Sequence, residues 1–196
     1  MRRAAGIVVV AICAAHRRNC GSRHLRLDRR MQIAFTKGLR EDWIVAIRND
    51  GSRVETRFPK KGPVPHDAVH LFVERGFALE RGFWGMVAAG HHPDELTALA
   101  KAAGHASASR AKVPDAEIVQ LLQAERLVEC FEADLWGGRG DDAVFLDIAA
   151  TACSYSHVPL PTVGAGTIAR LRSEIAAFAA EWAAAPMGYV APLEWP

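Results

Sequence analysis

The chain lacks the paired cysteines that zinc knuckles and redox dithiols require. Its four cysteines stand at positions 13, 20, 130 and 153, and no two of them form a CxxC pair. Cys130 falls in an expected amphipathic helix and Cys153 in an apolar stretch, where a buried free thiol is the usual finding. The cysteine pattern therefore gives no indication of a thiolate metal centre, and it is best suited to a reducing cytoplasm.

Long apolar runs and complete catalytic motifs are also missing. A transmembrane helix needs about 20 apolar residues, and the apolar run at residues 4–15 is shorter than that. The glycine-rich segment 137–140 follows an expected helix and has no Walker lysine, so we interpret it as a helix stop and not as a phosphate loop. Ser154 and Ser156 have no flanking elbow glycines, which argues against a serine triad with His157.

A net basic charge is absent from most of the chain. Residues 1–30 hold eight arginines and one acid, so that segment has a net charge of about +7 and residues 31–196 about −5, although the whole chain is +2. We therefore expect no nucleic-acid binding by the body of the protein. Three interpretations of residues 1–30 stay open: a spurious or disordered extension before a start at Met31, a targeting segment with secretion directed by residues 1–20, and a functional basic arm.

What is present indicates a soluble and mostly helical protein. Half of the 196 residues are hydrophobic and 23% are charged, the balance of a globular chain, and alanine-rich segments favour helix. Asn49-Asp50-Gly51 predicts a hairpin turn between two strands. We expect strands at 32–36, 43–47 and 54–58, helices at 65–78, 82–89, from 93, 114–135, 142–154 and 167–184, and coil from 186 to 196.

These elements predict an α+β fold that is predominantly α. A small N-terminal antiparallel β-sheet of two or three strands should pack on a bundle of about five or six helices. We expect residues 1–30 to be a basic extension and residues 31–196 to form a single globular domain.

The one pattern that points to chemistry lies on the expected helix 65–78. His66, His70 and Glu74 are spaced four residues apart, so they form one stripe beside the apolar face. Two imidazoles one turn apart can reach one metal ion, and Glu74 could be a third ligand or could orient His70. His91 or His92, at the start of a later helix, could supply a further ligand. By ligand type the metal would be zinc or another divalent transition metal.

Two other interpretations stay open. The stripe could be structural, with histidines that pair with Glu74 or with neighbouring helices, in a non-enzymatic interaction or regulatory protein. Glu125 and Glu129 share a helix face and could contribute to a metal site, although a solvated acidic face is the more common finding. Asp67 replaces the glutamate that zinc proteases carry after the first histidine, so we infer no peptidase activity. If the protein is an enzyme, metal-assisted hydrolysis is the general expectation.

The run from Pro65 to Glu74, followed by the run from Gly82 to Gly90, resembles a PHDxxHxxVE…GFWGxxAxG signature of small bacterial proteins. The resemblance covers about 25 residues and brings no established activity, cofactor or partner. It implies that the HDxxH helix and the GFWG turn belong together as one structural unit.

Overall fold

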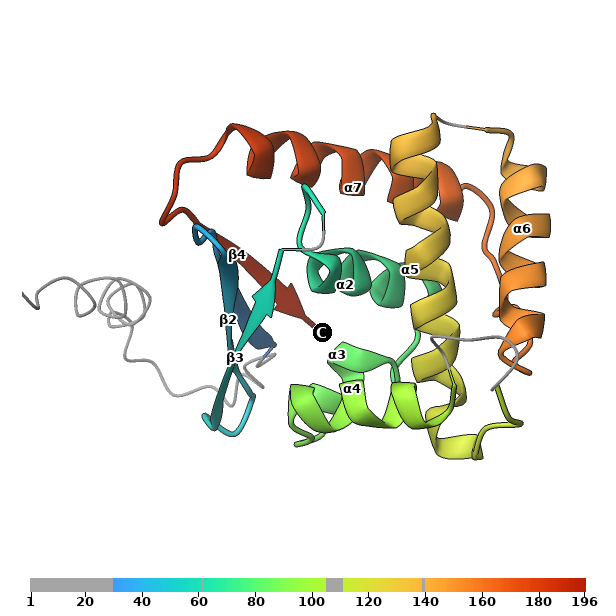
Figure 1. Cartoon of the computed structure of the whole chain (residues 1–196), viewed down its shortest axis with the longest axis horizontal. Coiled ribbons are helices and arrows are strands. Elements are labelled where there is room, and N and C mark those ends of the chain that lie inside the picture. Colours follow the sequence, from blue (N-terminus) through green and yellow to red (C-terminus); the bar gives the residue numbers. More distant parts are fainter. Residues whose placement is uncertain (1–29, 61, 105–110, 139) are drawn as a thin grey trace, which may run out of the picture.

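The computed structural model describes residues 30–60, 62–104, 111–138 and 140–196. A sheet lies at one end of the molecule, and helices fill the other (Figure 1). Helix α2 (His66–Phe77) runs through the middle of the helical part, with α5 (Val119–Gly137) and α7 (Thr167–Ala184) packed against it. The fold is α+β and predominantly helical, as the sequence predicts.

The sheet has four antiparallel strands in the order β3-β2-β1-β4. Strand β1 (Met31–Thr36) pairs with β2 (Glu41–Ile47), and β2 pairs with β3 (Arg53–Pro59). The expected hairpin is confirmed: Gly51 has a φ of 85°, a conformation that glycine adopts without strain. Alternate residues of β1 are buried against the helices, which is the two-residue period of a sheet with one covered face.

The predicted number of strands was too small, because the C-terminal tail is not coil. Residues Val190–Trp195 form β4, which pairs along the whole of β1. Pro192 is tolerated within β4 because β4 is an edge strand, where a missing N–H can face solvent. Ala191 and Trp195 are buried, and their alternation with exposed residues is the signal that the proline concealed.

Six α-helices occur in the described residues, in agreement with the sequence. Besides α2, α5 and α7 they are α3 (Phe83–Ala88), α4 (Pro93–Ala102) and α6 (Asp142–Tyr155). The predicted start of α5 at residue 114 is wrong: a 3-10 turn at Ala116–Ile118 precedes the helix. None of the helices in the described ranges is long and apolar enough to cross a membrane. Residues 1–29, to which the three interpretations given above apply, lie outside the described residues.

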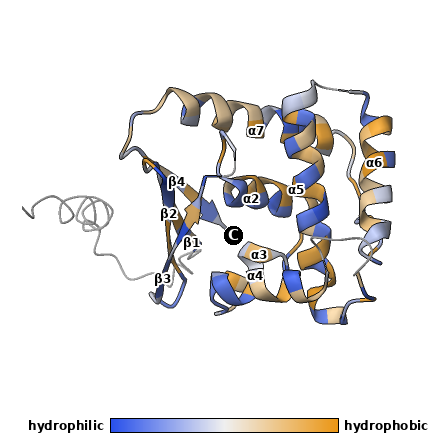
Figure 2. Ribbon diagram, in the orientation of Figure 1, coloured by the Kyte–Doolittle hydropathy of each residue, from blue (hydrophilic) through white to orange (hydrophobic). Residues whose placement is uncertain are grey.

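Helix α2 carries hydrophilic as well as hydrophobic residues (Figure 2), yet eight of its twelve residues are buried. Ala68, Val69, Leu71 and Val73 are fully buried. The same helix nevertheless buries His70 and Glu74, and buried polar groups require partners. Those partners define the candidate site.

Candidate metal centre

Three ligand atoms converge where α2 crosses α5. The Nε2 atoms of His66 and His70 are 3.2 Å apart. Oε2 of Glu125, on α5, is 3.6 Å from Nε2 of His66 and 3.5 Å from Nε2 of His70. In the described part of the chain, these three residues form the group whose geometry could hold a metal ion.

The separations match those of a tetrahedral site. Three atoms with these mutual distances lie on a circle with a radius of about 2.0 Å, and zinc binds imidazole nitrogen and carboxylate oxygen at about 2.0–2.2 Å. An ion slightly above the plane of the three atoms would therefore reach all of them without a rearrangement of the helices. A tetrahedral ion would keep one further coordination position.

Both imidazoles have a carboxylate on the opposite ring nitrogen. Nδ1 of His66 is 2.9 Å from Oε1 of Glu132, and Nδ1 of His70 is 3.0 Å from Oε1 of Glu74. A carboxylate accepts hydrogen bonds, so each Nδ1 carries the proton and donates it. In its neutral form, each ring can then offer its Nε2 lone pair to an ion held between the two rings and Glu125. This carboxylate–histidine arrangement is typical of metal-ligating histidines.

Glu74 is held in turn by the turn that follows α2. The backbone N–H of Phe83 donates to Oε1 of Glu74, and the N–H of Trp84 donates to Oε2, both at 2.9 Å. The indole N–H of Trp84 donates to the backbone oxygen of Asp67 at 2.7 Å. The start of α3 is thus tied to α2 by two bonds to the Glu74 carboxylate and one to the main chain of Asp67.

The electrostatics of the group favour a cation. Burial lowers the pKa of His66, but hydrogen bonds with Glu125 and Glu132 outweigh it and raise the pKa to about 9. Burial also opposes the charged form of His70, and Glu125 and Glu74 raise its pKa well above the ordinary value. Complete burial raises the pKa of Glu74, whereas its bonds to His70 and to two backbone N–H groups lower it. Positive charge between these carboxylates, from protons or from a metal, lowers the energy of the site.

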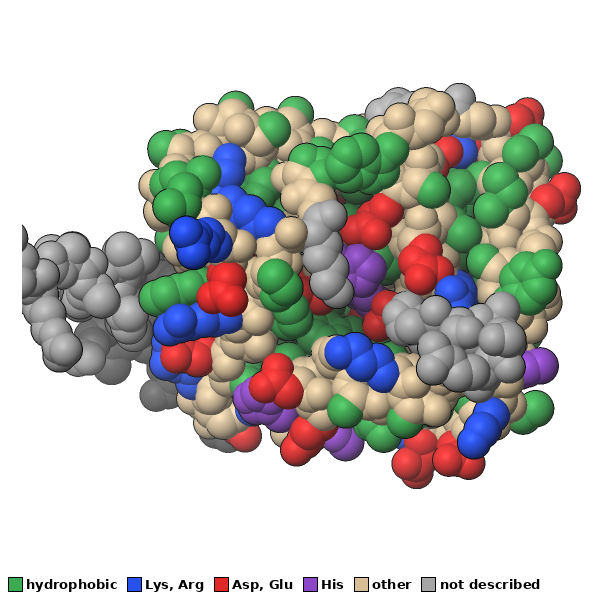
Figure 3. Space-filling view, in the orientation of Figure 1, with side chains coloured by type: hydrophobic (Ala, Val, Ile, Leu, Met, Phe, Trp, Pro, Cys, Tyr) green, Lys and Arg blue, Asp and Glu red, His purple; other side chains and the backbone are tan. Residues whose placement is uncertain are grey.

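The centre borders two clefts that meet at His66 and Glu125. One has a volume of about 380 Å³ and lies against the sheet, α3 and α4. The other has a volume of about 440 Å³ and is lined by Glu129, Glu132 and Trp136 on α5. Figure 3 shows a hollow between the sheet and the helices, with a histidine and several acidic side chains inside it. A ligand could therefore reach the metal position from solvent.

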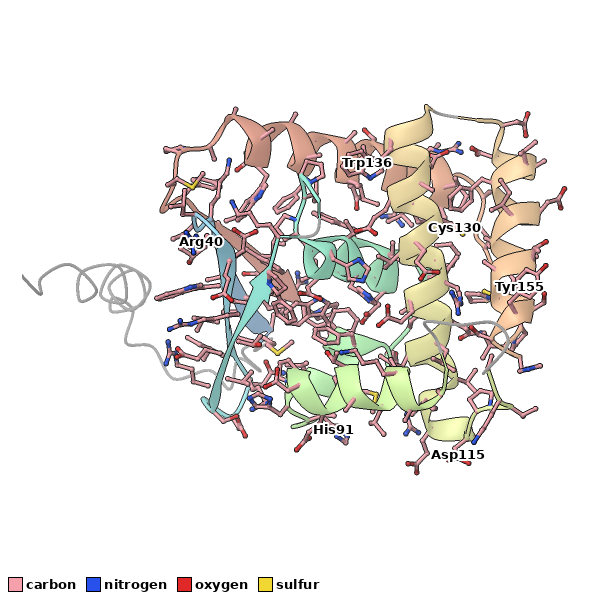
Figure 4. The ribbon with its side chains drawn as sticks, in the orientation of Figure 1. Arg40, His91, Asp115, Cys130, Trp136 and Tyr155 are labelled. Carbon is pink, nitrogen blue, oxygen red and sulfur yellow. The ribbon has the colours of Figure 1, made fainter. Side chains whose placement is uncertain are left out.

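The structure brings together only part of the site predicted from sequence. His66 and His70 face each other, and Glu74 takes the second of its two expected roles, orienting His70 instead of facing the metal position. His91 is not brought to this group: its side chain is exposed beside the start of α4 (Figure 4), and its backbone oxygen accepts a hydrogen bond from Arg48. His92 is the N-cap of α4, where its Nδ1 accepts from the backbone N–H of Asp94.

From the sequence, Glu125 had less weight as a metal ligand than the structure gives it. Its cluster with Glu129 and Glu132 resembled an ordinary acidic helix face. Its position in the helix could have identified it. Glu125 lies in the same stripe of α5 as the buried Leu121, Leu122 and Val128, where an apolar residue would be expected.

No family model, curated protein or solved structure matches this chain. The function must therefore be argued from the site itself.

Proposed function

We propose that the protein binds one divalent transition metal ion through Nε2 of His66, Nε2 of His70 and Oε2 of Glu125. The observation that supports this most directly is the nearly equilateral triangle of ligand atoms, with edges of 3.2, 3.5 and 3.6 Å. Two imidazoles and a carboxylate suit zinc, and they also suit iron or another transition metal. The carboxylates on both Nδ1 atoms support the same assignment, because they fix the tautomer that ligates.

The proposed centre belongs to the catalytic type of metal site. Structural zinc sites have four protein ligands, whereas catalytic sites have three and leave a position for water or substrate. Here three ligands are assigned, and the clefts give access to the remaining position. A metal ion in such a site lowers the pKa of a bound water to about 7. An ion held by His66, His70 and Glu125 would supply a Lewis acid and an activated water, and the chemistry that this arrangement supports best is hydrolysis of a bond to carbon or phosphorus, in which water supplies the hydroxyl group to one product and the proton to the leaving group.

The test is the metal content of the full chain and of two matched variants. Glu125→Gln keeps the size of the side chain and removes the anionic ligand, while Glu129→Gln makes the same change one turn along α5, outside the triangle. After loading with zinc and extensive dialysis, elemental analysis should find about one zinc per chain in the wild type and in Glu129→Gln. Glu125→Gln should retain far less, as should His70→Ala. Equal zinc content in Glu125→Gln and Glu129→Gln would overturn the ligand assignment.

A separate experiment tests whether the proposed ion has an open coordination position. Cobalt(II) in a tetrahedral site absorbs visible light, and the absorption changes when a small ligand binds the ion. Acetohydroxamate added to cobalt-loaded protein should change the spectrum in a saturable manner. An unchanged spectrum at saturating acetohydroxamate would show that the remaining position is closed, and hydrolysis would then be excluded as the role of the site.

A further inference from the structure

The cleft against the sheet has an apolar wall that the metal chemistry alone does not require. Ile44 and Phe58 come from the sheet, Val64 from the segment before α2, Phe83 from α3 and Ala100 from α4. The volume of about 380 Å³ is within the range of small-molecule sites, about 300–1,000 Å³. One end of this apolar space reaches His66 and Glu125, so a molecule lying in it would meet the metal position.

Three carboxylates, two lysines and His66 line this cleft. Nζ of Lys60 is 3.6 Å from the buried carboxylate of Asp42, which also accepts from the backbone N–H of Gly38, so these two charges offset each other. Glu125 faces the metal position, and Asp67 is engaged within the protein. Lys101, in the last turn of α4, is exposed, and none of the ion pairs between described residues includes it. Once Glu125 ligates the proposed ion, the Lys101 ammonium is a positive charge beside an apolar cleft that is available to a ligand.

The second cleft has the opposite character. Glu132 and Glu129, of which Glu129 pairs with Arg126, line it beside the exposed indole of Trp136, and its lining contains no lysine or arginine among the described residues. A cationic ligand would prefer that side of His66, and an anionic ligand would prefer the side of Lys101. The two clefts thus make opposite predictions about ligand charge.

We infer that the cleft between the sheet and α4 takes a small amphiphilic anion, with an apolar chain or ring and a carboxylate. This inference deepens the proposed function and rests on it, since the same cleft delivers the ligand to the metal position. The apolar body lies against Phe58, Val64 and Phe83, and the carboxylate pairs with Lys101. The substrate class would be an acid of this kind that also carries an ester or amide bond elsewhere in the molecule, where that bond can reach the metal position while the carboxylate stays beside Lys101.

The test uses octanoate and octylammonium, which share a chain length and differ in the sign of charge. Their binding to the zinc-loaded full chain is measured by isothermal titration calorimetry, in the wild type, in Lys101→Met and in Lys112→Met. Methionine keeps an unbranched apolar stem and removes the charge, and Lys112 is an exposed lysine outside the cleft lining. Octanoate should bind the wild type and Lys112→Met equally and Lys101→Met about tenfold more weakly, because a charge-assisted contact is lost. Octylammonium should bind the wild type more weakly than octanoate.

Three results would overturn the inference: octanoate that binds Lys101→Met as tightly as the wild type, octanoate that does not bind at all, and octylammonium that binds the wild type more tightly than octanoate does. The third result would assign ligand binding to the acidic cleft. Zinc content is determined on the same samples, so a failure of the metal-centre proposal can be distinguished from a failure of the anion-cleft inference. Binding of octanoate that depends on Lys101 in a chain that retains no zinc would support the anion cleft and overturn the metal centre.

Discussion

Gly82 controls the site at the scale of single residues, although it offers no ligand atom. A Cβ at this position would lie 2.5 Å from Cδ of Glu74, because the chain turns against the carboxylate before it enters α3. Only a residue without a side chain lets the N–H groups of Phe83 and Trp84 approach Glu74. The glycine therefore determines the position of Glu74, and Glu74 determines the orientation of His70.

Gly82→Ala should for this reason lower both stability and metal affinity. Displacing a buried, hydrogen-bonded carboxylate should reduce the free energy of unfolding by about 1–3 kcal/mol, and the loss of orientation at His70 should weaken zinc binding about 10–100-fold. Urea denaturation and a competition titration with a zinc chelator measure the two effects. Gly137→Ala is the control, since a Cβ there would meet no atom within 4 Å. Equal stability and zinc affinity in the two variants would contradict the role given to Gly82.

The metal-free protein should lose stability as pH rises from about 6.5 to 9. The folded-state pKa of His66 is raised to about 9 from 6.5, so protonated His66 stabilises the folded chain fully below pH 6.5, and this contribution is lost as pH rises through 9. Urea midpoints of the metal-free chain at several pH values measure the slope. His66→Gln should have a smaller decline over the same window, and an identical decline would contradict the assignment. The pH dependence of zinc affinity should be the opposite of that of stability. Zinc should bind more tightly as pH rises over this window, because zinc must displace the ring protons.

At the scale of secondary-structure elements, sequence patterns within one helix were sufficient to predict that helix and its faces. They were not sufficient to predict contacts between residues that lie far apart in the chain. The i, i+4 spacing of His66 and His70 predicted one face of a helix, and the structure has that face. Glu125 lies more than 50 residues further along the chain, so its approach depends on how α5 crosses α2. The spacing of apolar residues within α2 or within α5 does not predict where the two helices cross. The missed strand β4 is a similar case, because the pairing of Pro192 with Ala34 joins the two ends of the described fold.

The two histidines at the start of α4 give a prediction about that element alone. His92 is part of a capping box, in which Glu95 accepts a hydrogen bond from the backbone N–H of His92. His92→Ala should reduce the free energy of unfolding by about 1 kcal/mol, the usual effect of losing an N-cap, and His91→Ala should have a smaller effect. Neither variant should change zinc content. Zinc lost in His91→Ala would restore the ligand role that the sequence suggested for this residue.

At the scale of the whole molecule, a metal at this centre would link by coordination bonds helices that otherwise only pack against each other. His66 and His70 come from α2 and Glu125 from α5, while Glu74 connects the same centre to α3. Because the ligands converge only when these helices are packed, the ion binds the folded chain and stabilises it by mass action. Stabilisation by metal is therefore a property of the assembled fold and not of the α2 sequence.

Zinc at a free concentration 100 times its dissociation constant should raise the free energy of unfolding by about 2.7 kcal/mol. For a chain of this length that corresponds to an increase in Tm of about 5–10 °C, which differential scanning fluorimetry can detect. Glu129→Gln should show the same increase as the wild type, because that residue is partly exposed and pairs with Arg126 outside the triangle. Glu125→Gln should show little increase at the same zinc concentration. An equal increase in the two variants would mean that zinc stabilises the fold from another position, and the crossing of α2 and α5 would then be a packed polar junction stabilised by its protonated histidines.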